Sequence, residues 1–427
     1  CCLQPSGGSA PRMRFLYCVA CEGEGWLFQE RRRRRHLPAT KQACEACDGR
    51  GCVERPPSSE KKVKVLIVGC GVAGSATALA LLQRECFAVV VCERDSSLEE
   101  RRQGYAFTLQ QGAAALQSLG VAVTGAEPDQ HVSMDATTGE QIGQYASTVG
   151  KGFRTSRRPA NLVLPRERLR RALVKELPPE TVLWGRRFTG LQGGKAAFAV
   201  GEEEELHGYD VLLGADGIWS KVRAELTSEP ILDYLGLLVV LGIAPAASVP
   251  DSLRASTWQA LDGVARLYSM PFDDASVMWQ LSLAAELTEA REAGDLLDLA
   301  KRISATWKTP AYAMVNATPE EAVVGYALHD SKRVFVTNSD RVALLGDAAH
   351  AMSPFKGQGA NQALLDALSV ARSLRRAVVN GTPLEAALAE FAMEAAERVT
   401  PKLELSRRNA LLLHSKAALS LGDAARA

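Results

Sequence analysis

Residues 63–93 carry the clearest pattern of apolar and polar positions, and it predicts a strand, a helix and a second strand. Residues 63–68 are almost continuously apolar and rich in Val, as expected for a parallel strand buried on both faces. Residues 75–83 are rich in Ala and Leu and contain no Gly or Pro, which favours a helix. A second apolar run, residues 89–93, ends in Glu93. This alternation predicts an α/β fold.

The middle of the chain has a different pattern. Residues 237–243, 264–272 and 277–283 are short apolar or alternating runs, which predict strands of a mostly antiparallel sheet. Residues 364–421 are rich in Ala and Leu and predict helices. We therefore expect a Rossmann-like domain that contains an inserted, mostly antiparallel sheet.

Three glycines follow the first strand at the spacing G-x-G-x-x-G. Gly69 permits a tight turn, Gly71 lets backbone approach a pyrophosphate, and Gly74 lets the helix pack close to the strand. The helix N-terminus offers N–H groups to phosphates, and Glu93 can accept hydrogen bonds from ribose hydroxyls. The pattern predicts a dinucleotide site, with a ligand-free turn as the alternative. It does not choose between FAD and NAD(P).

Composition adds little that is specific. The chain has 427 residues, 47% hydrophobic and 23% charged, which is ordinary for a globular protein of two or three domains. A net charge of +1 gives no case for a nucleic-acid partner. The most apolar run, residues 235–247, contains Pro245 and is too short for a transmembrane segment. The first residue is Cys1 and not Met, so we expect a fragment whose targeting segment, if any, lies upstream.

The cysteines are concentrated at the amino-terminal end. All 10 lie between Cys1 and Cys92, which does not suit a disulfide scaffold for the whole chain. Their placement favours a reducing compartment, either cytoplasm or plastid.

Four of these cysteines form two C-x-x-C-x-G-x-G units, at Cys18 and Cys21 and at Cys44 and Cys47. Each unit places two thiolates on one metal, so two units predict a four-thiolate zinc site. Over residues 17–52 the repeat resembles the cysteine-rich domain of DnaJ-type chaperones and the small plastid proteins that share it. Two repeats in place of four imply one zinc ion. A redox-active dithiol and an unmetallated segment are the alternatives.

Two features surround this predicted zinc module. The run Arg31 to Arg35 suits a solvated loop, with an acidic partner or nucleic acid as the alternative. Residues 53–62 have the composition of a linker. The module is therefore expected to be tethered to the rest of the chain, where it could recruit a protein partner.

Two further motifs follow apolar strands, Asp216-Gly217 and Gly346-Asp347. With the glycine turn, they occur in the order found in single-component FAD-dependent aromatic-ring hydroxylases. The chain resembles this family, which includes p-hydroxybenzoate hydroxylase, salicylate hydroxylase and zeaxanthin epoxidase, over residues 63–374. The resemblance implies that NAD(P)H reduces FAD, that O2 forms a C4a-hydroperoxyflavin, and that an electron-rich aromatic substrate is hydroxylated.

The resemblance also implies roles for individual residues. Asp347 would accept hydrogen bonds from the ribityl chain, and Asp216 would contact the pyrophosphate and the nicotinamide cofactor. The helix that begins near Ala360 would direct its positive end at the flavin. The predicted cofactor-binding residues are Gly69, Gly71, Val72, Ala73, Gly74, Glu93, Arg94, Arg102, Arg166, Asp216, Gly217, Gly346, Asp347, Pro354, Gly357, Gly359, Ala360 and Asn361.

Some residues keep a structural alternative. Pro354 is expected to shape the active-site wall, and His350 is either a general base or an orienting residue. Asp216 alone could be a turn residue, and Arg166 alone a surface charge. In the predicted sheet the candidate pocket residues are Tyr268, Met270, Trp279 and Gln280, each of which could instead belong to the core. No residue stands out as a base for phenol deprotonation, so the substrate is not predicted.

The predicted domains are a zinc module (17–52), a linker (53–62), the first part of the FAD-binding domain (63–230), a substrate-binding sheet (231–326), and the rest of the FAD-binding domain with carboxyl-terminal helices (327–427). The function hypothesis is an FAD-dependent NAD(P)H monooxygenase. An isoprenoid epoxidase or a flavin reductase is the first alternative. A partner-binding protein with a degenerate flavin fold is the second.

Overall fold

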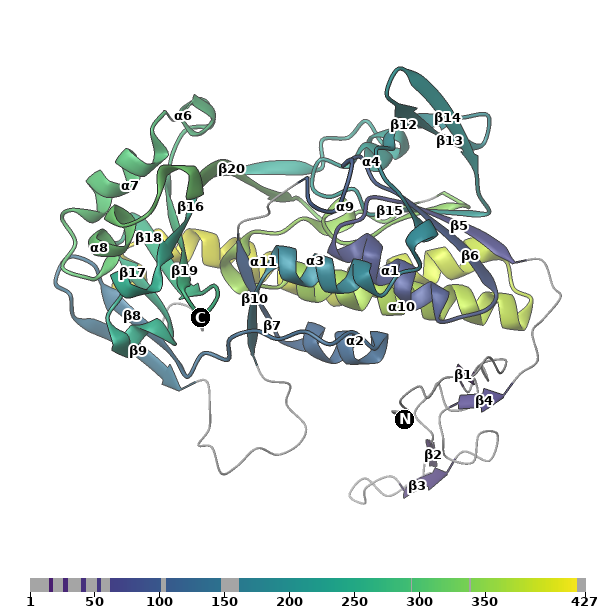
Figure 1. The fold of residues 1–427 in the computed structure, drawn as a ribbon, viewed down its shortest axis with the longest axis horizontal. Helices are drawn as coiled ribbons and strands as arrows, with labels where there is room; N and C mark the ends of the chain where they lie inside the picture. The colour runs from purple at the N-terminus through teal and green to yellow at the C-terminus, as the bar shows by residue number, and fades with distance from the viewer. Residues whose placement is uncertain are drawn as a thin grey trace. The chain divides into compact units, whose positions relative to one another are not determined.

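The structure is a computed structural model (Figure 1). It describes residues 15–17, 26–29, 40–43, 52–54, 62–100, 105–146, 161–292, 294–337 and 339–420. Its contacts divide the chain into two units, residues 1–63 with 82–88, and residues 64–81 with 89–427.

The amino-terminal part contains two short strand pairs. Strand β1 (Phe15–Tyr17) pairs antiparallel with β4 (Cys52–Glu54), and β2 (Trp26–Gln29) pairs antiparallel with β3 (Thr40–Ala43). The predicted zinc ligands Cys18, Cys21, Cys44 and Cys47 lie outside the described residues, so the zinc site stays a prediction. Within the described part of the chain, no group of three or more His, Cys, Asp or Glu residues could hold a metal ion.

A five-stranded sheet has the strand order β11-β6-β5-β15-β21. Its strands are β5 (Val63–Val68), β6 (Phe87–Cys92), β11 (Val182–Leu183), β15 (Val211–Gly214) and β21 (Val342–Leu344), and helix α1 (Val72–Leu82) follows β5. Strand β15 pairs in parallel with both β5 and β21. Because parallel neighbours end at the same edge, the segments after these three strands meet there. The predicted α/β class is confirmed.

A seven-stranded sheet has the strand order β20-β16-β19-β18-β17-β8-β9. Its strands are β8 (Gln130–Asp135), β9 (Gln141–Ala146), β16 (Leu232–Pro245), β17 (Thr257–Leu261), β18 (Ala265–Pro271), β19 (Ser276–Ala284) and β20 (Val323–Ser331). The pairing of β17 with β8 is parallel and the others are antiparallel. The predicted substrate-sheet range, 231–326, did not include β8 and β9. Their place in the sheet depends on the pairing of β8 with the distant strand β17, which a local sequence pattern does not reveal.

Helices lie beside both sheets (Figure 1). Helices α7 (Leu296–Ser304) and α8 (Ala311–Asn316) contribute to the core on one face of the seven-stranded sheet. Helix α10 (Gly359–Asn380) packs against α11 (Leu384–Leu413) and α2 (Gln111–Leu119).

The smaller elements are strands β7 (Ala106–Leu109), β10 (Leu162–Pro165), β12 (Arg187–Gln192), β13 (Lys195–Val200) and β14 (Glu203–Gly208), and helices α3 (Arg166–Lys175), α4 (Lys221–Leu226), α5 (Asp251–Arg254), α6 (Leu287–Glu292), α9 (Asp347–His350) and α12 (Ala417–Ser420). The 3-10 turns in the described ranges are η3 (Pro179–Thr181), η4 (Ala246–Ser248), η5 (Glu320–Ala322) and η6 (Pro354–Lys356). None of the helices in the described ranges has both the length and the apolar character needed to cross a membrane.

Candidate functional site

The three glycines after β5 are required for different physical reasons. Gly69 has φ +100°, and a Cβ there would lie 2.6 Å from the carbonyl oxygen of Ala215. A Cβ on Gly74 would lie 1.9 Å from the carbonyl oxygen of Gly69. A Cβ on Gly71 would meet nothing within 4 Å. Gly69 and Gly74 therefore hold the turn together, whereas Gly71 faces open space in which a ligand could approach.

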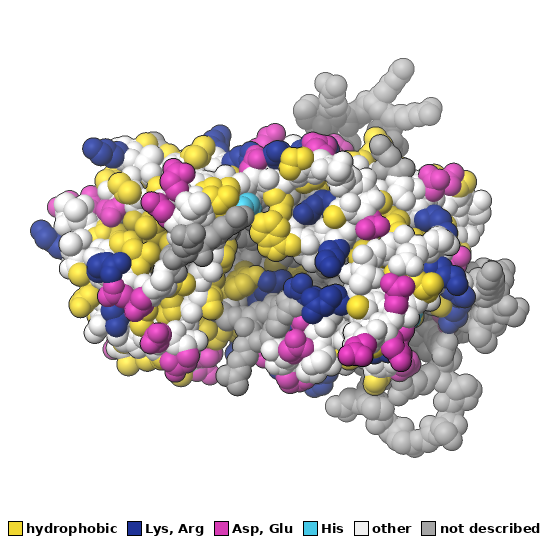
Figure 2. Space-filling view, turned by 90° about the horizontal axis from the view of Figure 1, so that it is seen from above, with side chains coloured by type: hydrophobic (Ala, Val, Ile, Leu, Met, Phe, Trp, Pro, Cys, Tyr) yellow, Lys and Arg dark blue, Asp and Glu magenta, His cyan; other side chains and the backbone are white. Residues whose placement is uncertain are grey.

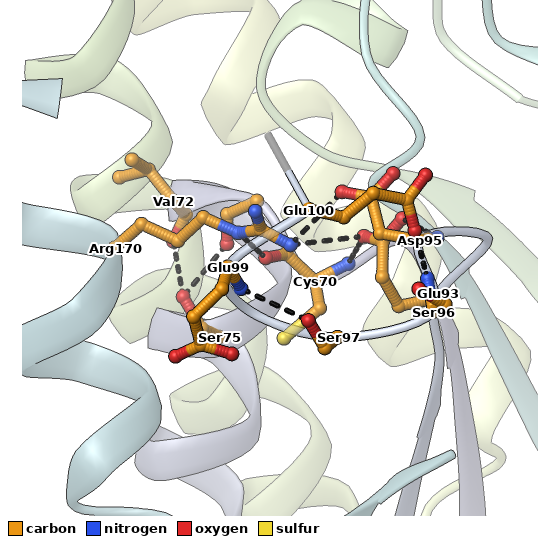
Figure 3. A network of polar contacts seen from close by, with 11 residues as sticks. Cys70, Val72, Ser75, Glu93, Asp95, Ser96, Ser97, Glu99, Glu100 and Arg170 are labelled. Carbon is orange, nitrogen blue, oxygen red and sulfur yellow. Dashed lines mark hydrogen bonds and ion pairs between the residues drawn. The ribbon is translucent and has the colours of Figure 1, made fainter. Parts of the chain in front are cut away.

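A network of buried polar side chains stabilises the turn between β5 and α1 (Figure 3). Glu93, only 7% exposed, accepts hydrogen bonds from the backbone N–H groups of Cys70 at 2.6 Å and Asp95 at 3.1 Å. Arg170 of α3 donates to the carbonyl oxygen of Cys70 at 2.8 Å and pairs with Asp95 at 3.3 Å. Burial, and next the charge of Glu93, raise the pKa of the Cys70 thiol to about 12, so it stays protonated at neutral pH. Sequence analysis missed Arg170.

The segments after β5, β15 and β21 open into a cavity of about 1150 Å³ whose other wall is the seven-stranded sheet. The predicted residues that line it are Gly71, Val72, Ala73, Arg166, Gly217, Asp347, Pro354, Gly357, Gly359 and Ala360. The predicted residues that do not line it are Gly69, Gly74, Glu93, Arg94, Asp216, Gly346, His350 and Asn361. Arg102 lies outside the described residues.

The cavity lining is electropositive. Among the described residues that line it, four are Lys or Arg and one is acidic, namely Arg166, Arg266, Lys356, Lys402 and Asp347. An excess of cations along a concave surface favours an anionic ligand, such as one that carries phosphates.

Asp347, at the start of α9, is the acidic group in this lining. Its carboxylate is half-buried and accepts no hydrogen bond from the residues that the structure describes. Helix α10 begins beside it, since a Cβ on Gly359 would lie 3.7 Å from its Oδ1. The N–H of Gln362 donates to the carbonyl oxygen of Gln358. The N–H groups that precede it in the first turn of α10 have no partner within the helix and can face a ligand. A carboxylate next to a helix N-terminus can bind a ligand that has hydroxyl groups and an electron-rich ring.

Asn361 acts within the protein. Its Oδ1 accepts from the N–H groups of Gln110 at 2.8 Å and Gly112 at 2.9 Å. Its Nδ2 donates to the carbonyl oxygens of Thr108 at 2.9 Å and Gly357 at 2.8 Å. Every donor and acceptor of this fully buried amide is used. Asn361 therefore positions the segments beside the cavity, and its side-chain amide has no free group for a cofactor.

His350 also lies beneath the site. It is fully buried, and its Nε2 lies 2.7 Å from Oδ2 of Asp366. Asp366 also accepts from the N–H of Gly346 at 2.8 Å and from Arg398 at 2.8 Å. Burial lowers the pKa of His350, but the charge and hydrogen bond of Asp366 outweigh it and hold that pKa above its usual value. This placement favours the orienting alternative over a general base. Sequence analysis missed Asp366. Its signal in the sequence was a single acidic residue within a stretch rich in Ala and Leu.

Asp216 caps a helix. Its Oδ1 accepts from the Ser220 hydroxyl at 2.6 Å, and its Oδ2 accepts from the N–H groups of Lys221 at 2.7 Å and Val222 at 3.1 Å. Gly217, which follows it, has φ +82°. The carboxylate thus stabilises the turn into α4, which agrees with the structural alternative, while the adjacent Gly217 lines the cavity.

The predicted arginines are placed differently from one another. Arg166 lines the cavity, donates to the Tyr105 hydroxyl and lies 5.3 Å from the centroid of the Tyr105 ring. Arg170 follows it by one helical turn, and this i, i+4 spacing was the signal available in the sequence. Arg94 is exposed.

The seven-stranded sheet divides its side chains between two faces. Tyr268, Met270 and Gln280 line the cavity, as predicted. Trp279 does not, because neighbouring residues of a strand point to opposite faces. Trp279 is fully buried and donates its indole N–H to Thr318 Oγ1 at 2.9 Å.

A buried polar chain that the sequence did not reveal also lies on the cavity face. Arg266 donates through Nε to Gln259 Oε1 at 2.8 Å, and Gln259 donates to Ser133 Oγ at 2.8 Å. The Arg266 guanidinium lies 4.7 Å from the centroid of the Tyr268 ring. Burial raises the pKa of Tyr268, so its hydroxyl stays protonated at neutral pH.

Comparison with known proteins identifies relatives of most of the chain. A protein-family model described as "FAD binding domain" matches residues 62–405. The aurachin C monooxygenase/isomerase of Stigmatella aurantiaca is 29% identical over 341 residues, which cover 78% of this chain and 85% of that protein. The zeaxanthin epoxidase of Spinacia oleracea is 26% identical over 362 residues, which cover 80% of this chain and 52% of the epoxidase. The chain thus spans about half the length of this epoxidase.

Solved structures share the fold. Klebsiella pneumoniae HpxO complexed with FAD and uric acid matches with a TM-score of 0.70 and 23% identity, covering 84% of this chain and 90% of that one. The 2,6-dihydroxypyridine-3-hydroxylase of Arthrobacter nicotinovorans matches with a TM-score of 0.69 and 17% identity, covering 84% and 94%.

Proposed function

Because the chain belongs to the FAD-binding monooxygenase family, we propose that it uses NAD(P)H and O2 to hydroxylate an electron-rich aromatic small molecule. The relatives reported above are a monooxygenase/isomerase and an epoxidase, and the solved structures include a hydroxylase. The observation that carries the proposal is the electropositive cavity, in which the Asp347 carboxylate lies beside the N-terminus of α10.

The residues present fit FAD. The open side of Gly71 and the cations of the lining suit a pyrophosphate. The Asp347 carboxylate suits the hydroxyls of a ribityl chain, and the first N–H groups of α10 suit the electron-rich edge of a flavin ring. When bound, FAD would accept electrons from NAD(P)H and activate O2.

The protein's own residues have three tasks in this proposal. Asp347 and the turn at Gly71 bind the cofactor. Asn361 and the pair of His350 with Asp366 hold the segments that carry those groups. The apolar side chains of the sheet, Met270 and Met278 among them, keep water away from the reacting ring.

The direct test is anaerobic reduction of the FAD-loaded protein by NADPH, followed as loss of flavin absorbance with and without a panel of aromatic compounds. Faster reduction with one compound, and its hydroxylation once O2 is admitted, is the expected result. Reduction that no compound changes, with an isoprenoid alkene oxidised instead, would favour the epoxidase alternative. NADPH oxidation without any product would favour a reductase.

The cofactor assignment has its own test in Asp347→Ala. Loss of hydrogen bonds to a charged acceptor should weaken FAD binding by at least about tenfold in a fluorescence titration. Asp340→Ala, which removes an exposed carboxylate that does not line the cavity, is the matched control. Equal FAD affinity of both variants and the wild type would overturn the role of Asp347.

We further propose that the amino-terminal part binds one zinc ion through Cys18, Cys21, Cys44 and Cys47. The backbone pairing supports this. Tyr17 pairs with Cys52, and Trp26 pairs with Ala43, so residues next to the two cysteine motifs in sequence pair with each other. Such a module could recruit a protein partner.

A further inference from the structure

The cavity face of the seven-stranded sheet carries a row of polar side chains in register. Ser133 of β8 pairs with Gln259 of β17, Gln259 with Tyr268 of β18, and Tyr268 with Gln280 of β19. Paired residues of adjacent strands point to the same face. The row continues to Leu241 of β16, which pairs with Gln280 and is apolar. Gln280 is thus the last polar group before an apolar wall.

The two glutamines of this row differ in their hydrogen bonds. Gln259 is fully buried, accepts from Arg266 and donates to Ser133, each at 2.8 Å. Gln280 is 7% exposed and lines the cavity, but its side-chain amide has no hydrogen-bond partner among the described residues. A polar side chain that faces a cavity without a protein partner needs hydrogen bonds from whatever fills that cavity. A ligand in the cavity can supply the missing bonds.

The surroundings of Gln280 limit the shape of such a ligand. Leu241 and Tyr268 flank it along the row, and Met270, Met278 and Phe355 line the same cavity. These side chains offer flat or flexible apolar contacts and few polar ones. The ligand therefore presents one polar edge to Gln280 and an apolar body to Leu241, Met270, Met278 and Phe355.

The chemistry of an amide selects that polar edge. A side-chain amide holds a donor and an acceptor side by side in one plane. Its full complement is an acceptor beside a donor, which a cyclic amide has in its ring C=O and N–H. A phenol offers a single hydroxyl, and a carboxylate would leave the amide oxygen facing a negative oxygen.

We propose that Gln280 is a specificity-determining residue that binds the cyclic-amide edge of a planar heteroaromatic substrate, of the 2-pyridone or 2-quinolone class. This inference rests on the proposed function and specifies its substrate class. The two hydrogen bonds orient the ring in the cavity, and the apolar walls hold its faces.

The test uses the FAD-loaded protein and two probes, 2-quinolone and N-methyl-2-quinolone, which differ in the ring N–H. Dissociation constants come from titration calorimetry, which does not depend on turnover. The wild type should prefer 2-quinolone by about tenfold, the worth of the lost bond and the unpaired group. Gln280→Met keeps the side-chain length and should bring the ratio of the two constants close to one.

A second variant tests the chemistry without removing polarity. Gln280→Glu presents two acceptors when ionised, so it should favour 2-aminoquinoline, whose protonated form has two adjacent donors, over 2-quinolone. The matched control is Gln117→Met, an exposed glutamine on α2 outside the cavity, which should keep the wild-type ratio. FAD content and thermal unfolding of each variant establish that it is folded.

Three outcomes would overturn the inference. The first is a wild-type ratio near one. The second is an unchanged ratio in Gln280→Met. The third is a loss of FAD affinity in Gln280→Met without a change in that ratio, which would assign the amide to the cofactor. If one of these outcomes occurs while the protein still hydroxylates an aromatic compound with NADPH, the inference fails and the proposed function stands. Absence of NADPH oxidation would instead contradict the proposed function.

Discussion

Polar side chains near the cavity fall into two groups at the scale of single residues. Asn361 and Asp216 have hydrogen bonds within the protein on each of their side-chain polar atoms, so they position other segments. The side chains of Asp347 and Gln280 line the cavity and have no hydrogen-bond partner among the described residues. Since buried or half-buried polar groups need partners, we propose that the second group contacts bound ligands.

The glycines of the turn give a matched pair of variants. Gly74→Ala places a Cβ 1.9 Å from a backbone oxygen, so the helix or the strand must shift, at a cost of about 1–3 kcal/mol in the free energy of unfolding. Gly71→Ala meets no atom within 4 Å and should leave stability nearly unchanged while it weakens FAD binding. Urea denaturation and FAD titration of both variants measure the two effects. Equal losses of stability would contradict the assignment.

At the scale of elements, helix α11 connects helix α10 with the seven-stranded sheet. Arg398 pairs with Asp366 beneath the Gly346-Asp347 segment at 2.8 Å. Arg407 pairs with Asp330 of β20. At the helix end, the Nε2 of His414 lies 2.8 Å from the hydroxyl of Ser282 on β19. One helix therefore ties the predicted cofactor segment to the predicted substrate sheet.

His414 makes this connection sensitive to acid. Burial lowers the pKa of His414 to about 4. In the unfolded chain it takes up a proton below about pH 6.5, whereas the folded protein binds it only near pH 4. Stability from this residue is therefore complete above pH 6.5 and falls by about 3 kcal/mol as the pH drops to 4. His414→Gln, which cannot titrate, should show a shallower loss of unfolding free energy in urea titrations between pH 7 and 4. Parallel curves for the two proteins would refute this role.

At the scale of the whole molecule, charge is dispersed. Figure 2 shows acidic and basic side chains interspersed on one face, in line with a net charge of +1. The residues that line the cavity lie between Gly71 and Leu405, within the residues 62–405 matched by the family model. The larger unit thus contains the whole candidate site.

A fragment of residues 62–427 should therefore bind FAD as tightly as the full chain, because it keeps every group of the cavity. The full chain should carry one zinc ion per molecule, and the fragment and Cys44→Ser should carry less or none. Flavin absorbance and atomic emission measure the two cofactors. Zinc retained by the fragment would place the metal elsewhere, and loss of FAD would show that the amino-terminal part contributes to the site.

The sequence by itself determined the features that depend on neighbouring residues. The apolar runs identified β5, β15 and β21, and the glycine spacing identified which positions need close packing, because backbone conformation and strand burial leave local patterns. It did not determine which polar groups touch a ligand. The Asn361 side chain accepts a hydrogen bond from the N–H of Gln110, 251 positions away, and no local pattern reveals that partner. Only the tertiary structure decided that Gln280 faces the cavity and Trp279 the core. The alternation of side chains along a strand is local, but distant segments determine which face of the sheet borders the cavity.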